Sequence, residues 1–139
     1  MTLLDAYALI AFLVGGPARA EVRGILREGG VAVASANLAE TLDVSQRVHG
    51  LSIARAMEVL EPLLEDSLAV IALDATTARV AAELRASYYH NSDRPISLAD
   101  AVLLASAKPD WRIATADPDV LAVARSEEVE TIALPAQGA

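Results

Sequence analysis

Four acidic side chains stand at positions from which they could act together on a metal ion: Asp5, Glu40, Asp100 and Asp117. Asp5 interrupts the apolar run LLDAYALIAF, where an isolated carboxylate is costly unless it is paired, solvated or bound to a metal. Clustered carboxylates repel one another and raise each other's pKa, and a hard cation such as Mg²⁺ relieves that repulsion. A water held by such a metal can attack a phosphodiester.

Each of these acids also has a simpler structural interpretation. Asp5 and Asp117 are each placed to cap a helix, and Ser97 to Asp100 matches a capping box. Glu40 fits a solvated charge on a helix. Asp74 follows a strand and opens a helix in the same way, and we predict that it is only a cap. Spacing alone therefore does not separate a metal ligand from a cap.

The elements that would position these acids alternate along the chain. Strands are predicted at Leu3-Leu4, Val31–Ala34, Leu68–Leu73, Arg112–Thr115 and Val129–Leu134. Helices are predicted over Ala6–Val14, Pro17–Glu28 and Ser52–Glu65. Three more begin at an N-cap and run from Ser35 to about His49, from Asp74 to about Tyr88 and from Ser97 to about Ala107. A short helix is predicted after Asp117. This alternation predicts an α/β fold with a parallel sheet covered on both faces, whose working residues gather at the carboxyl ends of the strands.

Length and composition restrict the class of protein. The 139 residues are 54% hydrophobic, which suits one domain over residues 1–139 with a real core. There is no cysteine, and no apolar run reaches the roughly 18 residues of a membrane span, so we expect a cytoplasmic protein. We expect Ala6–Val14 to be core rather than signal peptide, because no basic residue precedes it. The net charge of −8 opposes a nucleic-acid partner unless metal ions or a basic partner protein offset it.

Four segments resemble a known family when they are taken together: LLDAYALIAFL, SANLAETLDV, ISLADAVLLASA and IATADPDVLAVA. Their order and spacing are similar to those of a PIN domain, and most similar to the VapC toxins of bacterial VapBC toxin–antitoxin pairs. The resemblance covers essentially the whole chain. It implies a three-layer α/β/α sandwich with a mostly parallel five-stranded sheet, and the activity of an endoribonuclease toxin that depends on Mg²⁺ or Mn²⁺.

The resemblance also implies roles for the acids. Asp5 and Asp100 match the family's principal metal ligands, and Glu40 and Asp117 match the acids that complete the catalytic pocket. Ala6 departs from the family, because many members have Ser or Thr after the first Asp. One hydrogen bond that supports metal binding is therefore expected to be missing.

Three further residues are candidates for supporting roles. Thr115 matches the small hydroxyl residue two positions before the last acid. Asp119 is either an outer ligand or, more simply, a first-turn helix charge favoured by the helix dipole. Arg94, in the loop before Asp100, could meet an RNA phosphate or form a salt bridge with Asp93.

The resemblance implies partners as well: an RNA substrate, a small VapB-like antitoxin and a second copy of the chain in a homodimer. DNA would be contacted only through the antitoxin, and no membrane is involved. The two histidines, His49 and His90, are interpreted as helix-end residues that interact with the dipole. On this interpretation neither histidine has a catalytic role.

Two other classes of protein remain as alternatives. The first is another phosphate-handling α/β protein. A haloacid dehalogenase-type phosphatase would need Asp where Tyr7 stands, and a receiver domain would need a late lysine, whereas the single lysine, Lys108, precedes the fourth strand. The second is a non-catalytic binding domain in which the acids are helix caps.

Overall fold

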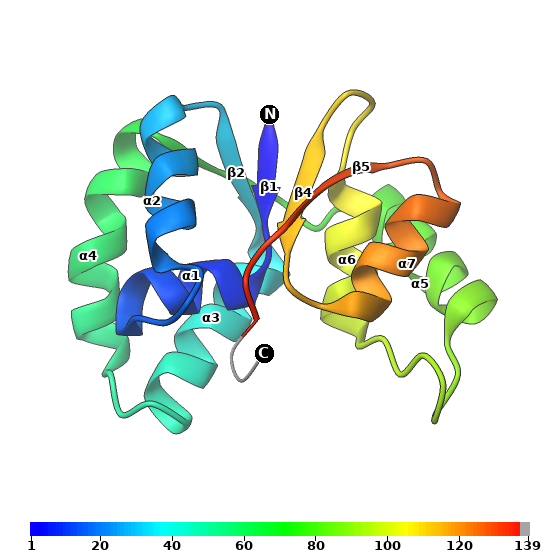
Figure 1. The fold of residues 1–139 in the computed structure, drawn as a ribbon, viewed down its shortest axis with the longest axis horizontal. Coiled ribbons are helices and arrows are strands. Elements are labelled where there is room, and N and C mark those ends of the chain that lie inside the picture. Colours follow the sequence, from blue (N-terminus) through cyan, green and yellow to red (C-terminus); the bar gives the residue numbers. More distant parts are fainter. Residues whose placement is uncertain (137–139) are drawn as a thin grey trace.

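A five-stranded parallel sheet lies at the centre of the computed structural model, which describes residues 1–136 (Figure 1). The strand order is β3-β2-β1-β4-β5, and every neighbouring pair is parallel. The strands are β1 (Thr2–Leu4), β2 (Val31–Ala34), β3 (Leu68–Ile71), β4 (Arg112–Thr115) and β5 (Glu130–Ala133). The predicted α/β/α fold is therefore confirmed, and the mostly parallel sheet is entirely parallel among the described residues.

Seven helices within residues 1–136 connect and cover these strands. They are α1 (Ala6–Val14), α2 (Arg19–Glu28), α3 (Ser35–Arg47), α4 (Ile53–Asp66), α5 (Ala75–Tyr88), α6 (Leu98–Ser106) and α7 (Pro118–Ser126). None of the helices in this described part of the chain is both long and apolar enough to cross a bilayer.

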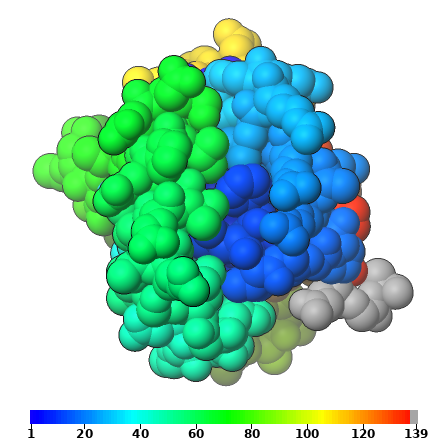
Figure 2. All heavy atoms as spheres, turned by 90° about the vertical axis from the view of Figure 1, so that its left-hand side faces the viewer, coloured from blue at the N-terminus to red at the C-terminus, as the bar shows by residue number. Residues whose placement is uncertain are grey.

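Alternate residues of the central strand point to opposite faces of the sheet and so divide the core into two layers. Leu4 packs in one cluster with Leu9 of α1 and Leu60 of α4. Leu3 packs in the other cluster with Leu103 of α6. Figure 1 shows α1, α2 and α4 on one side of the sheet and α5, α6 and α7 on the other, and Figure 2 shows α1 between α2 and α4. This burial explains why Leu3 and Leu4 of β1 and all four residues of β2 are apolar.

Helix caps fix where several of these helices begin. The side chains of Asp5, Ser52, Asp74, Ser97 and Asp117 each accept a hydrogen bond from a backbone N–H in the first turn of their helix. Ser97 and Asp100 form the predicted capping box. The caps predicted at Asp5, Asp74, Ser97 and Asp117 are therefore confirmed.

The predicted cap at Ser35 is wrong. Helix α3 begins at Ser35 itself, and its N-cap, Ala34, offers no side-chain hydrogen bond. The Ser35 hydroxyl oxygen instead accepts a hydrogen bond from the Leu73 backbone N–H at 3.2 Å. The Ser35 hydroxyl, which the local sequence predicts as a helix cap, therefore forms a tertiary contact instead. Strand β3 also ends at Ile71, two residues before the predicted Leu73.

Candidate active site

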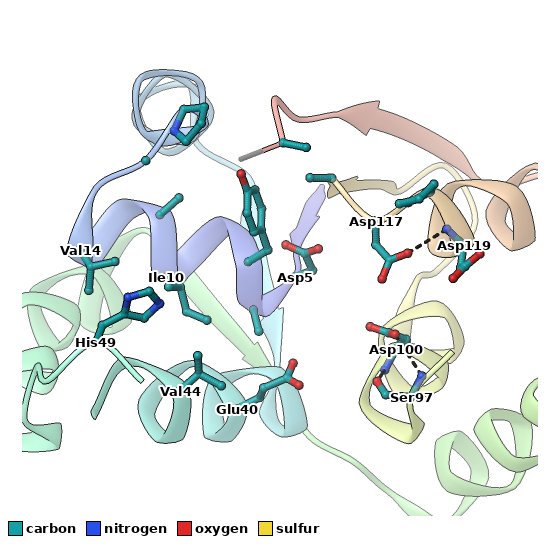
Figure 3. A pocket seen from close by; sticks show the side chains of 18 of the residues that line it. Asp5, Ile10, Val14, Glu40, Val44, His49, Ser97, Asp100, Asp117 and Asp119 are labelled. Carbon is teal, nitrogen blue, oxygen red and sulfur yellow. Dashed lines mark hydrogen bonds between the residues drawn. The ribbon is translucent and has the colours of Figure 1, made fainter. Parts of the chain in front are cut away.

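The carboxyl ends of β1 and β4, the first turn of α6 and side chains from α1 and the middle of α3 surround one cavity of about 640 Å³. Asp5, Glu40, Asp100 and Asp117 all line it, together with Asp119. Figure 3 shows Asp5 and Glu40 near the middle of the cavity and Asp100 and Asp117 at one end. Four acids from four separate segments thus lie at one edge of the sheet, as the parallel topology predicts.

Asp5 is the most buried of the four acids, with 6% of its surface exposed. Burial raises the pKa of its carboxyl to about 6 from the usual 3.8, and the charges of Asp100 and Asp117 add to the rise. Hydrogen bonds from the Thr115 side chain and the Ala8 backbone N–H oppose it. A carboxylate in this setting is stabilised by a cation.

Asp100 and Glu40 are perturbed in the same direction. Burial raises the pKa of Asp100, and repulsion from Asp117 contributes, while hydrogen bonds from Ser97 oppose the rise. Burial likewise raises the pKa of Glu40, followed by repulsion from Asp100. Mutual repulsion among Asp5, Asp100 and Asp117 makes the cavity an electrostatically unfavourable place for carboxylates in the absence of a cation.

Capping occupies one identified oxygen of each capping acid. Asp5 Oδ1 accepts from the Ala8 N–H at 2.8 Å, and Asp117 Oδ1 accepts from the Asp119 N–H at 2.8 Å. Asp100 Oδ2 accepts from the Ser97 N–H at 3.1 Å. The second oxygen of each carboxylate takes no part in the cap. Capping and metal binding are therefore compatible roles for the same side chain.

Thr115 lies beneath these acids and is fully buried at the end of β4. Its Oγ1 accepts a hydrogen bond from the Asp117 backbone N–H at 3.1 Å. Its side chain also hydrogen-bonds the Asp5 carboxylate. Thr115 therefore links the first and last acids of the quartet without lining the cavity itself.

The donor set fits a hard divalent cation held partly through water. Within residues 1–136, no three Asp, Glu or His side chains lie close enough together to bind one ion directly. The side chains that face the acidic end offer oxygen donors, and Mg²⁺ is commonly held by one or two carboxylates and several waters. Asp5 and Asp100, with Glu40 and Asp117 around them, match that requirement.

The other end of the cavity has no carboxylate, and none of its residues is among those predicted for the site. We call it the neutral arm and define it by Ile10, Val14, Val44 and His49, which all line the cavity. Figure 3 shows the His49 ring between Val14 and Val44, at the end away from Asp100 and Asp117. The four-residue spacing of Ile10 and Val14 indicates a shared helix face, but no local signal places His49 beside it.

Arg94 does not line the cavity. Its backbone pairs with that of His90, with hydrogen bonds of 2.8 and 3.0 Å, and its guanidinium lies 5.7 Å from the centre of the Tyr88 ring. Asp93, the predicted alternative partner, lies 3.7 Å from His90 Nδ1. The His90 ring therefore organises this turn, and Arg94 is not brought to the acids.

Comparisons with known proteins agree with this geometry. The family model described as "PIN domain" matches residues 2–126. No curated protein sequence matches the chain significantly.

Solved structures with similar folds were found as well. A chain of FitAcB from Neisseria gonorrhoeae is 25% identical, with a TM-score of 0.62 and coverage of 95% of this chain and 96% of that one. A chain of a toxin–antitoxin complex from Klebsiella pneumoniae is 20% identical, with a TM-score of 0.64 and coverage of 88% and 91%. VapC20 of Mycobacterium tuberculosis, described as a toxin that cleaves the sarcin–ricin loop, is 17% identical, with a TM-score of 0.62 and coverage of 97% and 90%. The chain therefore belongs to the PIN domain family and shares its fold with proteins of toxin–antitoxin complexes.

Proposed function

We propose that this protein is the endoribonuclease toxin of a type II toxin–antitoxin pair, and that it cleaves RNA phosphodiesters with the help of Mg²⁺ or Mn²⁺. The observation that carries the proposal is the convergence of Asp5, Glu40, Asp100 and Asp117 on one cavity. Membership of the PIN family and the similarity in fold to VapC20, an RNA-cleaving toxin by its description, support it.

Each residue of the candidate site would have a separate role. Asp5 and Asp100 would hold the ion, since Asp5 is buried, Asp100 is partly buried, and the pKa values of both carboxyls are raised. Glu40 and Asp117 would complete the site and orient water, and Thr115 would fix the positions of Asp5 and Asp117. Asp119 would contribute negative charge at the rim. A bound divalent ion supplies activation of water and stabilisation of charge on phosphorus.

The charge of the protein supports a role for a cation. With a net charge of −8, the chain as a whole repels RNA. A divalent ion held by Asp5 and Asp100 would reduce that repulsion at the point where the phosphate must approach. Electrostatics thus favours ion binding before or together with RNA binding.

We further propose a small VapB-like antitoxin as partner, a homodimeric assembly and a cytoplasmic location. The similar chain from Klebsiella pneumoniae, which is described as part of a toxin–antitoxin complex, supports the antitoxin. A basic side chain delivered by the antitoxin would suit the acidic end of the cavity. Contact with DNA would then be made by the antitoxin.

A second candidate function is a non-catalytic domain that keeps the fold. It is favoured by the fact that Asp5, Asp100 and Asp117 all accept capping hydrogen bonds. On this hypothesis burial of the acids is a structural cost, and the cavity binds no ion.

Substitution by asparagine separates the two functions, because Asn caps a helix about as well as Asp but is a poor ligand for Mg²⁺. We expect wild-type protein to cleave RNA with Mg²⁺ and to stop when EDTA is added. Asp5→Asn and Asp100→Asn should remain folded and lose cleavage. Asp74→Asn is the matched control, since Asp74 caps α5 outside the cavity.

Cleavage of an RNA panel, analysed on gels alongside circular dichroism spectra of each variant, gives the answer. Equal activity of Asp5→Asn, Asp100→Asn and Asp74→Asn would contradict the metal site. Absence of cleavage by folded wild-type protein with Mg²⁺ and with Mn²⁺ would favour the non-catalytic domain.

A further inference from the structure

The cavity has two chemically different ends, and the proposed function uses only one. The acidic end is lined by Asp5, Glu40, Asp100 and Asp117, whereas the neutral arm has no carboxylate. Both ends belong to one continuous cavity of about 640 Å³. A ligand that reaches the acids therefore has direct access to the neutral arm.

The side chains of the neutral arm suit a flat, uncharged and partly apolar group. Ile10, Val14 and Val44 offer apolar walls, and His49 offers an aromatic ring (Figure 3). In RNA recognition, unpaired bases are commonly stacked on aromatic side chains, including histidine. None of the residues that line this end is a lysine or an arginine, and its apolar walls and aromatic ring match a base better than a phosphate.

Helix α1 sets the distance between the two ends. Asp5 caps this helix, and Ile10 and Val14 follow on it at positions five and nine. At a rise of 1.5 Å per residue, these two side chains lie roughly 7 to 14 Å along the axis from the acid. That span corresponds to a nucleotide next to the one whose phosphate meets the ion.

We propose that the neutral arm is a base-binding subsite, in which His49 stacks on the unpaired base of a nucleotide beside the scissile phosphate. The inference rests on the proposed ribonuclease function and deepens it, because it assigns the binding of one base to residues outside the acidic quartet. The subsite selects single-stranded RNA, since a base held in a duplex cannot enter the arm.

RNA that lacks one base tests this assignment. An oligoribonucleotide that the wild-type protein cleaves at one mapped bond is prepared with a single abasic nucleotide at each neighbouring position in turn. At one position, loss of the base should lower kcat/KM of the wild-type protein about tenfold. In His49→Ala the intact RNA should already be slower by a similar factor, and the abasic change should have no further effect.

Three more variants refine the result. His49→Phe keeps an aromatic face and should keep the abasic penalty. Val14→Trp, at a half-exposed position at the end of α1, fills the arm and should remove the penalty. His90→Ala is the matched control, because His90 lies in the turn with Arg94 and not in the cavity.

The outcomes distinguish this inference from the function on which it rests. Equal abasic penalties in wild type, His49→Ala and His90→Ala would overturn the subsite while leaving the ribonuclease in place. That result is also expected if the neutral arm receives a side chain of a partner protein. Wild-type protein that cleaves none of the RNAs would overturn both proposals.

Discussion

The Thr115 hydroxyl oxygen accepts a hydrogen bond from the Asp117 backbone N–H at 3.1 Å, and the same side chain hydrogen-bonds the Asp5 carboxylate. One buried hydroxyl thus positions two acids that lie 112 residues apart in the chain. The arrangement gives the small residue before the last acid a defined physical role. It holds the backbone at Asp117 and lowers the cost of ionising Asp5.

Thr115→Val tests this role, because valine keeps the shape of threonine and removes the hydroxyl. The Asp117 N–H would lose its acceptor and Asp5 a donor, so we expect a loss of about 1–3 kcal/mol in the free energy of unfolding. The pKa of Asp5 should rise further. Urea denaturation and carboxyl NMR titration measure the two effects, and Thr115→Ser, which keeps the hydroxyl, should show much less of either.

The pH dependence of stability in EDTA follows from the pKa of Asp5. The folded protein holds the Asp5 proton up to about pH 6, whereas an unfolded chain releases it near 3.8. Stability from this group is therefore present below pH 3.8 and is lost as the pH rises to 6, with a total of about 3 kcal/mol. Asp5→Asn should lack this loss, so it should be more stable than wild type at pH 7. If the free energies of unfolding of wild type and Asp5→Asn changed in parallel from pH 4 to 7, that result would contradict the raised pKa of Asp5.

Removal of a second acid should also stabilise the metal-free protein. Asp100→Asn relieves repulsion with Asp117 and Asp5, and the asparagine oxygen can still accept from the Ser97 N–H. We expect it to melt at a higher temperature than wild type in EDTA. Asp74→Asn should not melt higher, because hydrogen bonds from Thr77 lower the pKa of Asp74 and its charge is not repelled. A lower melting temperature for Asp100→Asn would argue that these acids do not repel one another.

Mg²⁺ should reverse the order of the melting temperatures of wild type and Asp100→Asn. Binding of an ion to the folded state alone raises the melting temperature, by an amount that grows with the ratio of ion concentration to Kd. We expect wild type and Asp74→Asn to gain stability when Mg²⁺ replaces EDTA, and Asp5→Asn and Asp100→Asn to gain little. Differential scanning fluorimetry over a range of Mg²⁺ concentrations measures this, and equal gains in all four proteins would place the ion elsewhere.

Tyr7 provides a prediction outside the acids. Its hydroxyl donates a hydrogen bond to the Pro135 carbonyl oxygen at 2.7 Å, which ties the segment after β5 to α1 beside the cavity. Tyr7→Phe should lower stability by about 0.5–1.5 kcal/mol, because one hydrogen bond is lost and water replaces it only in part. Chemical denaturation measures the change, and faster hydrogen exchange at Leu134 would confirm that the segment has loosened.

The sheet and most of the caps were predictable because their signals are local. Alternation of apolar strands such as Val31–Ala34 with capped helices requires parallel strands, and parallel strands bring their carboxyl ends together. This is why the sequence alone predicts that Asp5, Asp100 and Asp117 lie at one edge of the sheet. The same reasoning could not exclude Asp74, whose helix begins in the same way on an outer strand.

The failures of sequence reasoning all involve contacts between distant segments. Ser35 is a residue type typical of an N-cap, but its hydroxyl oxygen accepts a hydrogen bond from the Leu73 N–H instead. His49 follows the last turn of α3, and only the packing of α3 against α1 brings it into the cavity. Such pairings leave no period or motif in the sequence.

The position of β1 at the middle of the sheet has a consequence for synthesis of the protein. Asp5 is made 112 residues before Asp117, and its strand pairs with β4, where Leu4 lies opposite Ala114. The ribosome must therefore release most of the chain before the acids can meet, since this pairing spans more than a hundred residues. A nascent chain that ends before Asp117 therefore has no complete acidic site, because Asp5, Glu40 and Asp100 are all made before this last acid.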